Sequence, residues 1–368
     1  MKEKPVDPEF IVDDEPMTPA TPEKPSTGSK LKKRITLALF ILLNVGILVY
    51  TAFIDFGTER PKYTGEPLGW KNLLFLLGGI GCLMVFYAAE TIKYLLMMRH
   101  LGEKVSVRRA FETAALGKYY DSITPSGAGG QPFQIWHLYS HGYSTGAAAA
   151  MPLTGFFTMQ FGFVILALAV FLFNNNAIDA VGIKITAYIG AVVYMVVPVM
   201  IILTAVAPKV MMRIVAFFVN LGGKMRIVKN PQATIRKSVR GLMNYSKSLK
   251  SIANNPPLLI GMLALSVLLQ VAICSLPYFV IHAFGGEIGY IQAVSMCVFI
   301  YAAITIVPTP GNAGAAEGSF YLLFSSLSTA GLFWAMLVWR FLSYYSFIII
   351  GLLIYGVNAL KKLLHQKE

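Results

Sequence analysis

The sequence is short of charged residues. Lys, Arg, Asp and Glu make up 13% of its 368 residues, whereas 56% are hydrophobic, and the mean hydropathy is +0.62. Soluble domains are usually about 25% charged and about 45–50% apolar. This shortage of charge excludes a soluble globular domain and predicts an integral membrane protein.

Cysteine and histidine are also scarce. The three cysteines all fall inside apolar runs, which excludes a disulfide framework and a cysteine zinc cluster. His137 and His141 are spaced to share a helix face, but two histidines without a third ligand seldom hold zinc. The glycine-rich segments are not followed by the lysine of a P-loop. We therefore expect neither a metal nor a cofactor, and the sequence offers no catalytic residue.

The N-terminal tail differs from the rest of the chain in composition. Residues 1–29 hold seven acids, three lysines and six prolines. Such a segment buries too little apolar surface to offset the entropy lost on ordering, and it lacks the basic start and short apolar run of a signal peptide. We expect a disordered acidic cytoplasmic tail over 1–29, a membrane domain over 30–360 and a short cytoplasmic tail over 361–368.

Six apolar runs are long enough to cross a membrane, which takes about 20 residues in a helix. These runs are Ile35–Ile54, Leu73–Met98, Met151–Phe173, Ile183–Ala207, Leu258–Phe284 and Leu332–Val357. Two further apolar segments, about 106–146 and 291–327, are interrupted by prolines and glycines. The sequence predicts an all-α polytopic membrane protein with six full spans plus two re-entrant hairpins, or alternatively with eight spans.

Lys and Arg mark the cytoplasmic side of membrane proteins. Residues 207–257 contain ten basic residues and no acid, and more basic residues precede the first span and follow the last. Apart from Arg60, Lys62 and Lys71, the loops on the other side are nearly free of them. Both termini are therefore expected in the cytoplasm. The basic loop 207–257 contains an amphipathic stretch and is expected to rest on anionic lipid.

The two interrupted segments belong to an internal repeat. The motifs TPSGAGGQP, from Thr124, and TPGNAGAAEG, from Thr309, are 185 residues apart, as are the starts of the preceding spans at 73 and 258. A unit of span, broken segment and span thus recurs at about 73–173 and 258–357 with opposite topology. Inverted repeats with discontinuous helices are typical of transporters that bind substrate near the membrane midplane.

The broken segments suit the wall of a polar cavity. Non-helical backbone at membrane depth occurs only inside the protein or beside water. Glycine permits positive φ, proline suits the first turn of a new helix, and Asn312 is expected to cap the helix that carries Glu317. The predicted hinge or backbone positions are Pro125, Gly127, Gly129, Gly130, Pro132, Pro308, Pro310 and Gly311. Each new helix would direct free N–H groups toward a phosphate or carboxylate.

Ionisable groups at membrane depth usually mark function. Arg340 is the best candidate for holding an anionic headgroup, because its planar fork matches phosphate. A cationic part of a headgroup would meet acids. The predicted headgroup or cavity side chains are Asp121, Thr124, Gln131, Glu317 and Arg340. Glu90 and Lys93 are expected to pair on one helix face near an interface.

Three motifs in a fixed order resemble a known family. TPSGAGGQP, VPTPGNAGAAEG and the closing WRFLSYYSFIIIG look like the transmembrane domain of lysylphosphatidylglycerol synthases, or multiple peptide resistance factors, over about residues 35–360. That domain also occurs alone in flippase-like proteins. The resemblance implies movement of aminoacylated phosphatidylglycerol across the bacterial cytoplasmic membrane, linked to resistance to cationic antimicrobial peptides. The family often has an acid at the position of Gln131.

The leading functional prediction is a lipid translocase with an anionic phospholipid as substrate. In the full-length synthases a separate cytosolic domain makes the lipid from lysyl-tRNA, and this sequence reaches Glu368 shortly after the last span, so that domain is not expected here. The alternatives are a phosphatidylglycerol lysyltransferase and a non-catalytic membrane partner of such an enzyme. The expected partners are membrane lipids, with a homo-oligomer left open. Nucleic acid is expected only if the chain is an enzyme that uses lysyl-tRNA.

Overall fold

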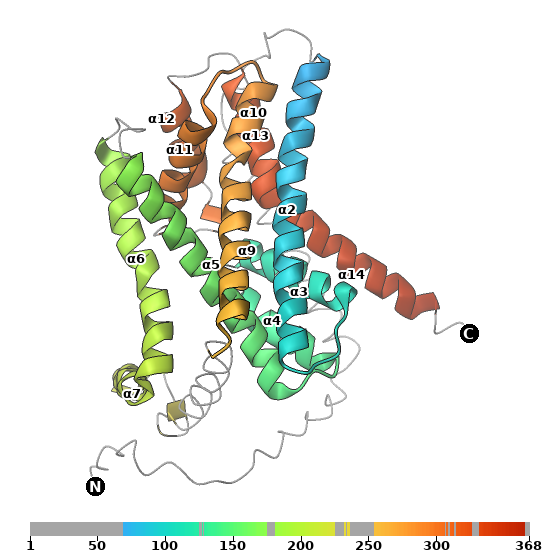
Figure 1. Cartoon of the computed structure of the whole chain (residues 1–368), viewed down its shortest axis with the longest axis vertical. Coiled ribbons are helices and arrows are strands. Elements are labelled where there is room, and N and C mark those ends of the chain that lie inside the picture. The colour runs from blue at the N-terminus through green and yellow to red at the C-terminus, as the bar shows by residue number, and fades with distance from the viewer. Residues whose placement is uncertain are drawn as a thin grey trace. The chain divides into compact units, whose positions relative to one another are not determined.

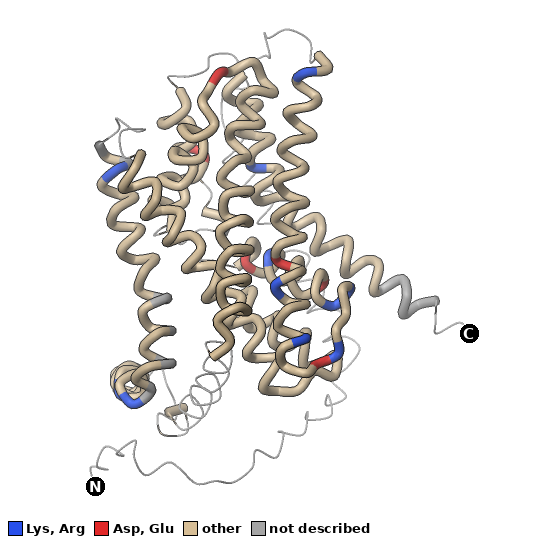
Figure 2. Tube along the Cα trace, viewed as in Figure 1, with Lys and Arg blue, Asp and Glu red and all other residues tan. Residues whose placement is uncertain are grey.

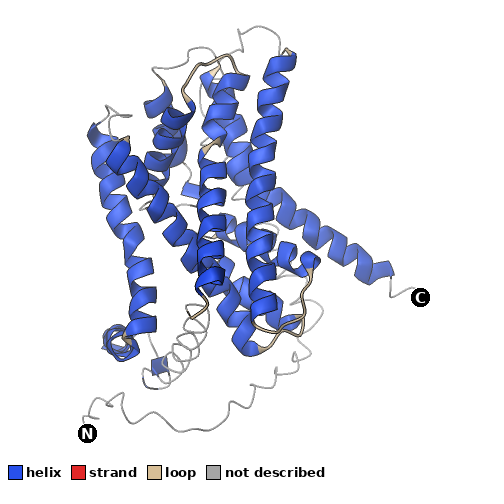
Figure 3. Ribbon diagram, in the orientation of Figure 1, coloured by secondary structure: helices blue, strands red, loops and turns tan. Residues whose placement is uncertain are grey.

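The computed structural model describes residues 69–124, 127, 129–174, 181–224, 232, 234–235, 254–305, 307, 310–312, 314–325 and 331–364. The regular elements in these residues are helices, without a strand among them (Figure 3). Four helical stretches are apolar and long enough to cross a membrane: Trp70–His100, Thr145–Phe173, Pro256–Ala283 and Leu332–Asn358. The prediction of an all-α polytopic membrane protein is confirmed. The predicted tail 1–29 and span Ile35–Ile54 lie outside the described residues.

The chain divides into two compact units. The smaller comprises residues 1–50 and 202–247, and its described part contains the end of α6 (Val181–Val206) and all of α7 (Pro208–Lys224). Pro208 stands at the start of α7, where its missing N–H costs nothing. α7 separates polar from apolar residues on opposite faces, as the sequence predicts for an interfacial helix. The larger unit comprises residues 51–201 and 248–368.

The first repeat lies in the larger unit. It consists of α2 (Trp70–His100), α3 (Val107–Ile123), α4 (Gly130–Ser140) and α5 (Thr145–Phe173). α3 and α4 pack against each other as a hairpin, at the lower end of α2 in Figure 1. Ser106 and Ser144 begin α3 and α5, and each side chain accepts a hydrogen bond from a backbone N–H three residues later. Each cap satisfies a donor that the helix leaves unpaired.

The second repeat also lies in the larger unit. It consists of α9 (Pro256–Cys274), α10 (Leu276–Ala283), α11 (Tyr290–Ile304), the 3₁₀ turn η4 (Pro310–Asn312), α12 (Ala315–Phe324), α13 (Leu332–Arg340), the π-helical turn η5 (Phe341–Tyr345) and α14 (Ser346–Leu364). α11 and α12 pack together near the upper end of α9 and α10, at the opposite end from α3 and α4 (Figure 1). The two hairpins therefore lie at opposite ends of the long helices, as expected for an inverted repeat.

The structure interrupts two spans that the sequence reads as continuous. The predicted span Leu258–Phe284 is divided at Ser275, because Pro277 lies in the first turn of α10 and cannot donate to the preceding turn. The predicted span Leu332–Val357 contains the π-helical turn directly after Arg340. Single π-helical turns inside α-helices are frequent at functional sites.

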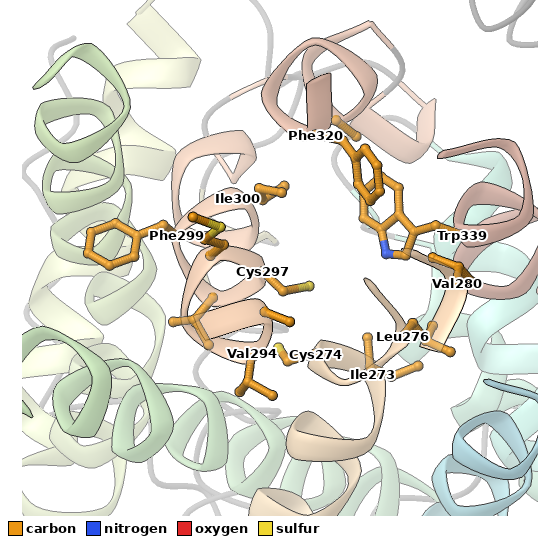
Figure 4. Close-up of a cluster of buried hydrophobic side chains, with 14 of the residues drawn as sticks. Ile273, Cys274, Leu276, Val280, Val294, Cys297, Phe299, Ile300, Phe320 and Trp339 are labelled. Carbon is orange, nitrogen blue, oxygen red and sulfur yellow. The ribbon is translucent and has the colours of Figure 1, made fainter. Parts of the chain in front are cut away.

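The two repeats are interlocked through backbone contacts and a shared core. α2 lies along α9 and α10, while the first helix of each hairpin packs on the closing part of the other repeat, α3 on α14 and α11 on α5. A Cβ placed on Gly162 of α5 would lie 2.8 Å from the carbonyl carbon of Ser266 on α9. Small residues allow this close approach between membrane helices. A buried apolar cluster that includes Cys274, Cys297, Phe320 and Trp339 joins α9 through α13 (Figure 4).

The close contact between α5 and α9 makes Gly162 a sensitive position. We expect Gly162→Ala to lower the free energy of unfolding by about 1–3 kcal/mol, because the new methyl group must displace the α9 backbone. The matched control is Gly261→Ala on α9, where an added Cβ meets nothing within 4 Å. Thermal unfolding of both purified variants in detergent measures the difference. Equal melting temperatures for the two variants would contradict the packing described here.

Candidate functional site

The first break, between α3 and α4, is a turn in which two backbone N–H groups donate hydrogen bonds to side chains. The Gly130 N–H donates to Asp121 Oδ1 at 2.9 Å, and the Gly129 N–H donates to Thr124 Oγ1 at 2.9 Å. Thr124 in turn donates to the Tyr120 carbonyl oxygen at 2.7 Å. Two of the predicted site residues thus hold the backbone of the break.

Glycine is required in this turn by space and by conformation. A Cβ on Gly130 would lie 2.3 Å from Asp121 Oδ1, and one on Gly129 would lie 2.6 Å from Thr124 Cγ2. Gly127 has a φ of +63°, a backbone conformation that residues other than glycine rarely adopt. The exposed Pro132 lies in the first turn of α4, where it leaves no helical hydrogen bond unmade. Pro125 lies outside the described residues.

The second break, between α11 and α12, is built around a buried ion pair. Arg340 Nε contacts Glu317 Oε1, and the two residues are only 4% and 6% exposed. Arg340 Nη2 also donates to the Gly311 carbonyl oxygen at 3.2 Å, while Glu317 accepts from the Gly314 N–H. Each charged group therefore satisfies backbone of the break as well as its partner. Pro310 opens the short turn η4, and Pro308 lies outside the described residues.

The prediction that Asn312 caps α12 is wrong. The sequence predicts Asn312 as the capping residue, but α12 begins after Gly314, and the side chain that accepts the cap hydrogen bond is that of Glu317. The reason is conformational. Asn312 has a φ of +53° and Gly311 a φ of +60°, so the chain is still turning in the left-handed region at Asn312.

Tyr344, in the π-helical turn, connects the two breaks. Its ring lies 4.8 Å from Arg340 Cζ, within cation–π distance, and its hydroxyl donates to the Ser122 carbonyl oxygen at 3.2 Å. Gly311 lies against the same ring, so closely that an added Cβ would overlap it. α3 also contacts η4 directly. The prediction that the two breaks lie close together is confirmed.

A cavity of about 610 Å³ opens where the breaks meet. Its residues from the first break are Asp121, Ser122, Gly127 and Gln131, and those from the second are Thr305, Gly311, Asn312 and Arg340. Three of the five predicted headgroup side chains, Asp121, Gln131 and Arg340, thus line one cavity. The other two, Thr124 and Glu317, hold the backbone or the arginine beside it.

Charged residues are sparse along the described helices, and several of them are paired (Figure 2). Glu90 and Lys93 form the predicted ion pair, at 3.0 Å. They do so in the interior, because Lys93 is fully buried and also donates to the Gly155 carbonyl oxygen on α5 at 3.2 Å. The pair therefore joins α2 to α5.

Sequence reasoning missed Glu112, which is the buried acid of the first hairpin. It accepts from Arg108 Nε at 2.8 Å and from Arg109 Nη1 at 2.7 Å, and it lies 3.8 Å from His137 Nε2 on α4. Arg108 also donates to Asn358 on α14 at 2.8 Å. The acid sits three and four residues after two arginines, a spacing that favours ion pairs on a helix and was the available signal.

Sequence reasoning also missed Lys118, which lines the cavity between the two breaks. Its Nζ lies 3.6 Å from Met159 Sδ on α5 and 5.4 Å from the centre of the Phe86 ring on α2. Lys118 precedes Asp121 by one helical turn, so the signal in the sequence was a lysine beside a predicted site acid in a hairpin expected at membrane depth.

Comparison with known proteins identifies the family of the chain. The family described as the lysylphosphatidylglycerol synthase TM region matches residues 35–351, a range that includes both breaks, the first repeat and the second repeat as far as the beginning of α14. The chain belongs to this family. A UPF0104 membrane protein from Archaeoglobus fulgidus is 22% identical over 319 residues, which are 82% of this chain and 93% of that protein. Membership in the lysylphosphatidylglycerol synthase transmembrane family agrees with the apolar helices, and the protein is a multi-pass membrane protein.

The Glu317–Arg340 pair is expected to be essential for stability. Glu317→Gln leaves a buried guanidinium without its counter-charge, which typically costs 3–5 kcal/mol. The control is Glu287→Gln, which removes an exposed acid. The double variant Glu317→Leu/Arg340→Met should unfold at a higher temperature than Glu317→Gln, since no buried charge remains. Melting temperatures in detergent test both points, and a double variant less stable than Glu317→Gln would contradict them.

Proposed function

We propose that this protein moves a phospholipid between the leaflets of a membrane, with the polar headgroup passing through the cavity between the two breaks. The observation that carries the proposal is the position of that cavity. It lies between the α3–α4 and α11–α12 hairpins, which are at opposite ends of the long helices, and residues of both breaks line it. Transporters with inverted repeats bind their substrates at such a junction of broken helices.

A second, apolar groove supports a lipid substrate over a water-soluble one. The groove lies between α5 and α6, has a volume of about 260 Å³, and is lined almost entirely by apolar side chains. Phe163 and Tyr194 line both the groove and the cavity between the breaks, and their ring centres are 4.7 Å apart. A headgroup in the cavity would therefore have its acyl chains directed through this opening toward the bilayer.

The family supports a narrower version of the proposal. The family is described as the transmembrane region of lysylphosphatidylglycerol synthase, so the lipid we propose is phosphatidylglycerol or its aminoacylated form. The membrane is then the bacterial cytoplasmic membrane, with both termini of the chain in the cytoplasm, and the physiological outcome is resistance to cationic antimicrobial peptides.

Lipid movement can be measured with the purified protein in vesicles. Phosphatidylglycerol with a fluorescent headgroup is placed in both leaflets, and a membrane-impermeant reductant bleaches the outer one. We expect the protein to expose label from the inner leaflet. Ser343→Trp should slow this exposure by about tenfold, a barrier raised by about 1.4 kcal/mol, because residue 343 lines the cavity and a larger side chain fills it.

The matched control is Leu353→Trp, which places the same side chain at an exposed position on α14. It should leave the rate unchanged. Equal rates for both variants and the unaltered protein would exclude the cavity as the path. If the protein instead forms lysyl-lipid from charged tRNA without exposing label, the chain is a transferase and the proposed function is wrong.

A further inference from the structure

We propose that Lys118, rather than Arg340, anchors the phosphate group of the lipid in the cavity. The inference rests on the proposed function, because it assigns the headgroup subsite of the same cavity. It is carried by the different surroundings of the buried and half-buried cations in the described part of the larger unit.

Arg340 already has its charge compensated. It pairs with Glu317, donates to the Gly311 carbonyl oxygen and lies against the Tyr344 ring. A phosphate that bound to Arg340 would compete with a buried carboxylate, and separation of the pair would leave Glu317 buried and uncompensated. Uncompensated buried charge is strongly unfavourable. The pair is therefore a fixed part of the cavity wall.

Lys93 is compensated in a similar way. Its Nζ contacts the Glu90 carboxylate and the Gly155 carbonyl oxygen, and it is fully buried away from the cavity lining. Arg109 pairs with Glu112 at the base of α3. Lys93 thus joins α2 to α5, Arg109 pairs within α3, and neither of them lines the cavity.

Lys118 has different surroundings. Within the described residues its Nζ contacts the Met159 thioether and the face of the Phe86 ring, with no ion-pair contact to a carboxylate. Asp121, one helical turn away on α3, interacts electrostatically with Lys118 but makes no ion-pair contact with it, and its Oδ1 accepts from the Gly130 N–H. A thioether and a ring face solvate an ammonium weakly. The half-buried ammonium therefore favours an anion that enters the cavity.

Gln160 adds a second, independent group to the same cavity. It follows Met159 on α5, is 7% exposed, and its side-chain oxygen has no hydrogen-bond partner in the described structure. Buried polar atoms without partners are costly. An acceptor in the same cavity as the ammonium suits a headgroup that carries a hydroxyl or an ammonium beyond its phosphate. The ligand class is thus a phosphodiester lipid whose headgroup ends in a hydrogen-bond donor.

Binding by the full-length protein in detergent tests the assignment without relying on transport. The probe is lyso-phosphatidylglycerol, with monoacylglycerol as a probe that lacks phosphate and inorganic phosphate as one that lacks the chain. We expect Lys118→Met to weaken lyso-phosphatidylglycerol binding by about tenfold or more, equivalent to about 1.4 kcal/mol. Lys118→Arg should retain most of the affinity, because the positive charge remains.

The control is Lys71→Met, which removes an exposed lysine on α2 and should leave binding unchanged. Lys118→Met should remain folded, because the Lys118 Nζ makes no direct ion-pair contact in the described residues, and thermal unfolding in detergent checks this. Unchanged binding by Lys118→Met, or equally tight binding of monoacylglycerol, would overturn the inference. Competition by inorganic phosphate as strong as that by the lipid would assign the site to free phosphate instead of a lipid and would overturn it too.

The inference and the proposed function can fail separately. If Lys118→Met loses lyso-phosphatidylglycerol binding while the unaltered protein moves no labelled lipid in vesicles, the phosphate site stands and the translocase proposal falls. If the unaltered protein moves labelled lipid and Lys118→Met binds and moves it equally well, translocation stands and the assignment of Lys118 falls.

Discussion

Backbone that leaves the helical path inside a membrane must find hydrogen-bond partners within the protein, because the lipid offers none. This constraint shapes both breaks of the present structure. At the first break, Asp121 and Thr124 accept from two consecutive glycine N–H groups. At the second, Glu317 accepts from Gly314 and Arg340 donates to Gly311. These polar side chains therefore form hydrogen bonds with the backbone of the breaks. Only polar side chains that are not used in this way are available to bind a substrate.

The same constraint explains how the two breaks meet. Tyr344 donates to the Ser122 carbonyl oxygen, which lies near the end of α3, while its ring packs on Arg340. The π-helical turn that carries Tyr344 follows Arg340 directly. One turn thus places a hydrogen bond on the first break and a cation–π contact on the second. Backbone groups in the wall of the cavity between them are hydrogen-bonded within the protein, and Lys118 and Gln160 are among the polar residues that line it.

Much of this architecture could be predicted from the sequence, because the signals are local. Long apolar runs locate the spans, and the paired proline and glycine motifs locate the breaks at a constant offset of 185 residues. The pairing of Glu90 with Lys93 follows from their spacing on one helix face. The closeness of the two breaks followed from the inverted repeat, since a shared midplane site is the usual reason for such a repeat.

The roles of individual side chains could not be predicted in the same way. The sequence determined the helical membrane class, the repeat and the position of each break, since these depend on composition and on short-range backbone preferences. Only the tertiary structure decided that Arg340 is compensated by Glu317 from another helix and that Lys118 lies between a thioether and a ring. Charge compensation depends on which groups meet across distant segments, and that information is absent from local spacing.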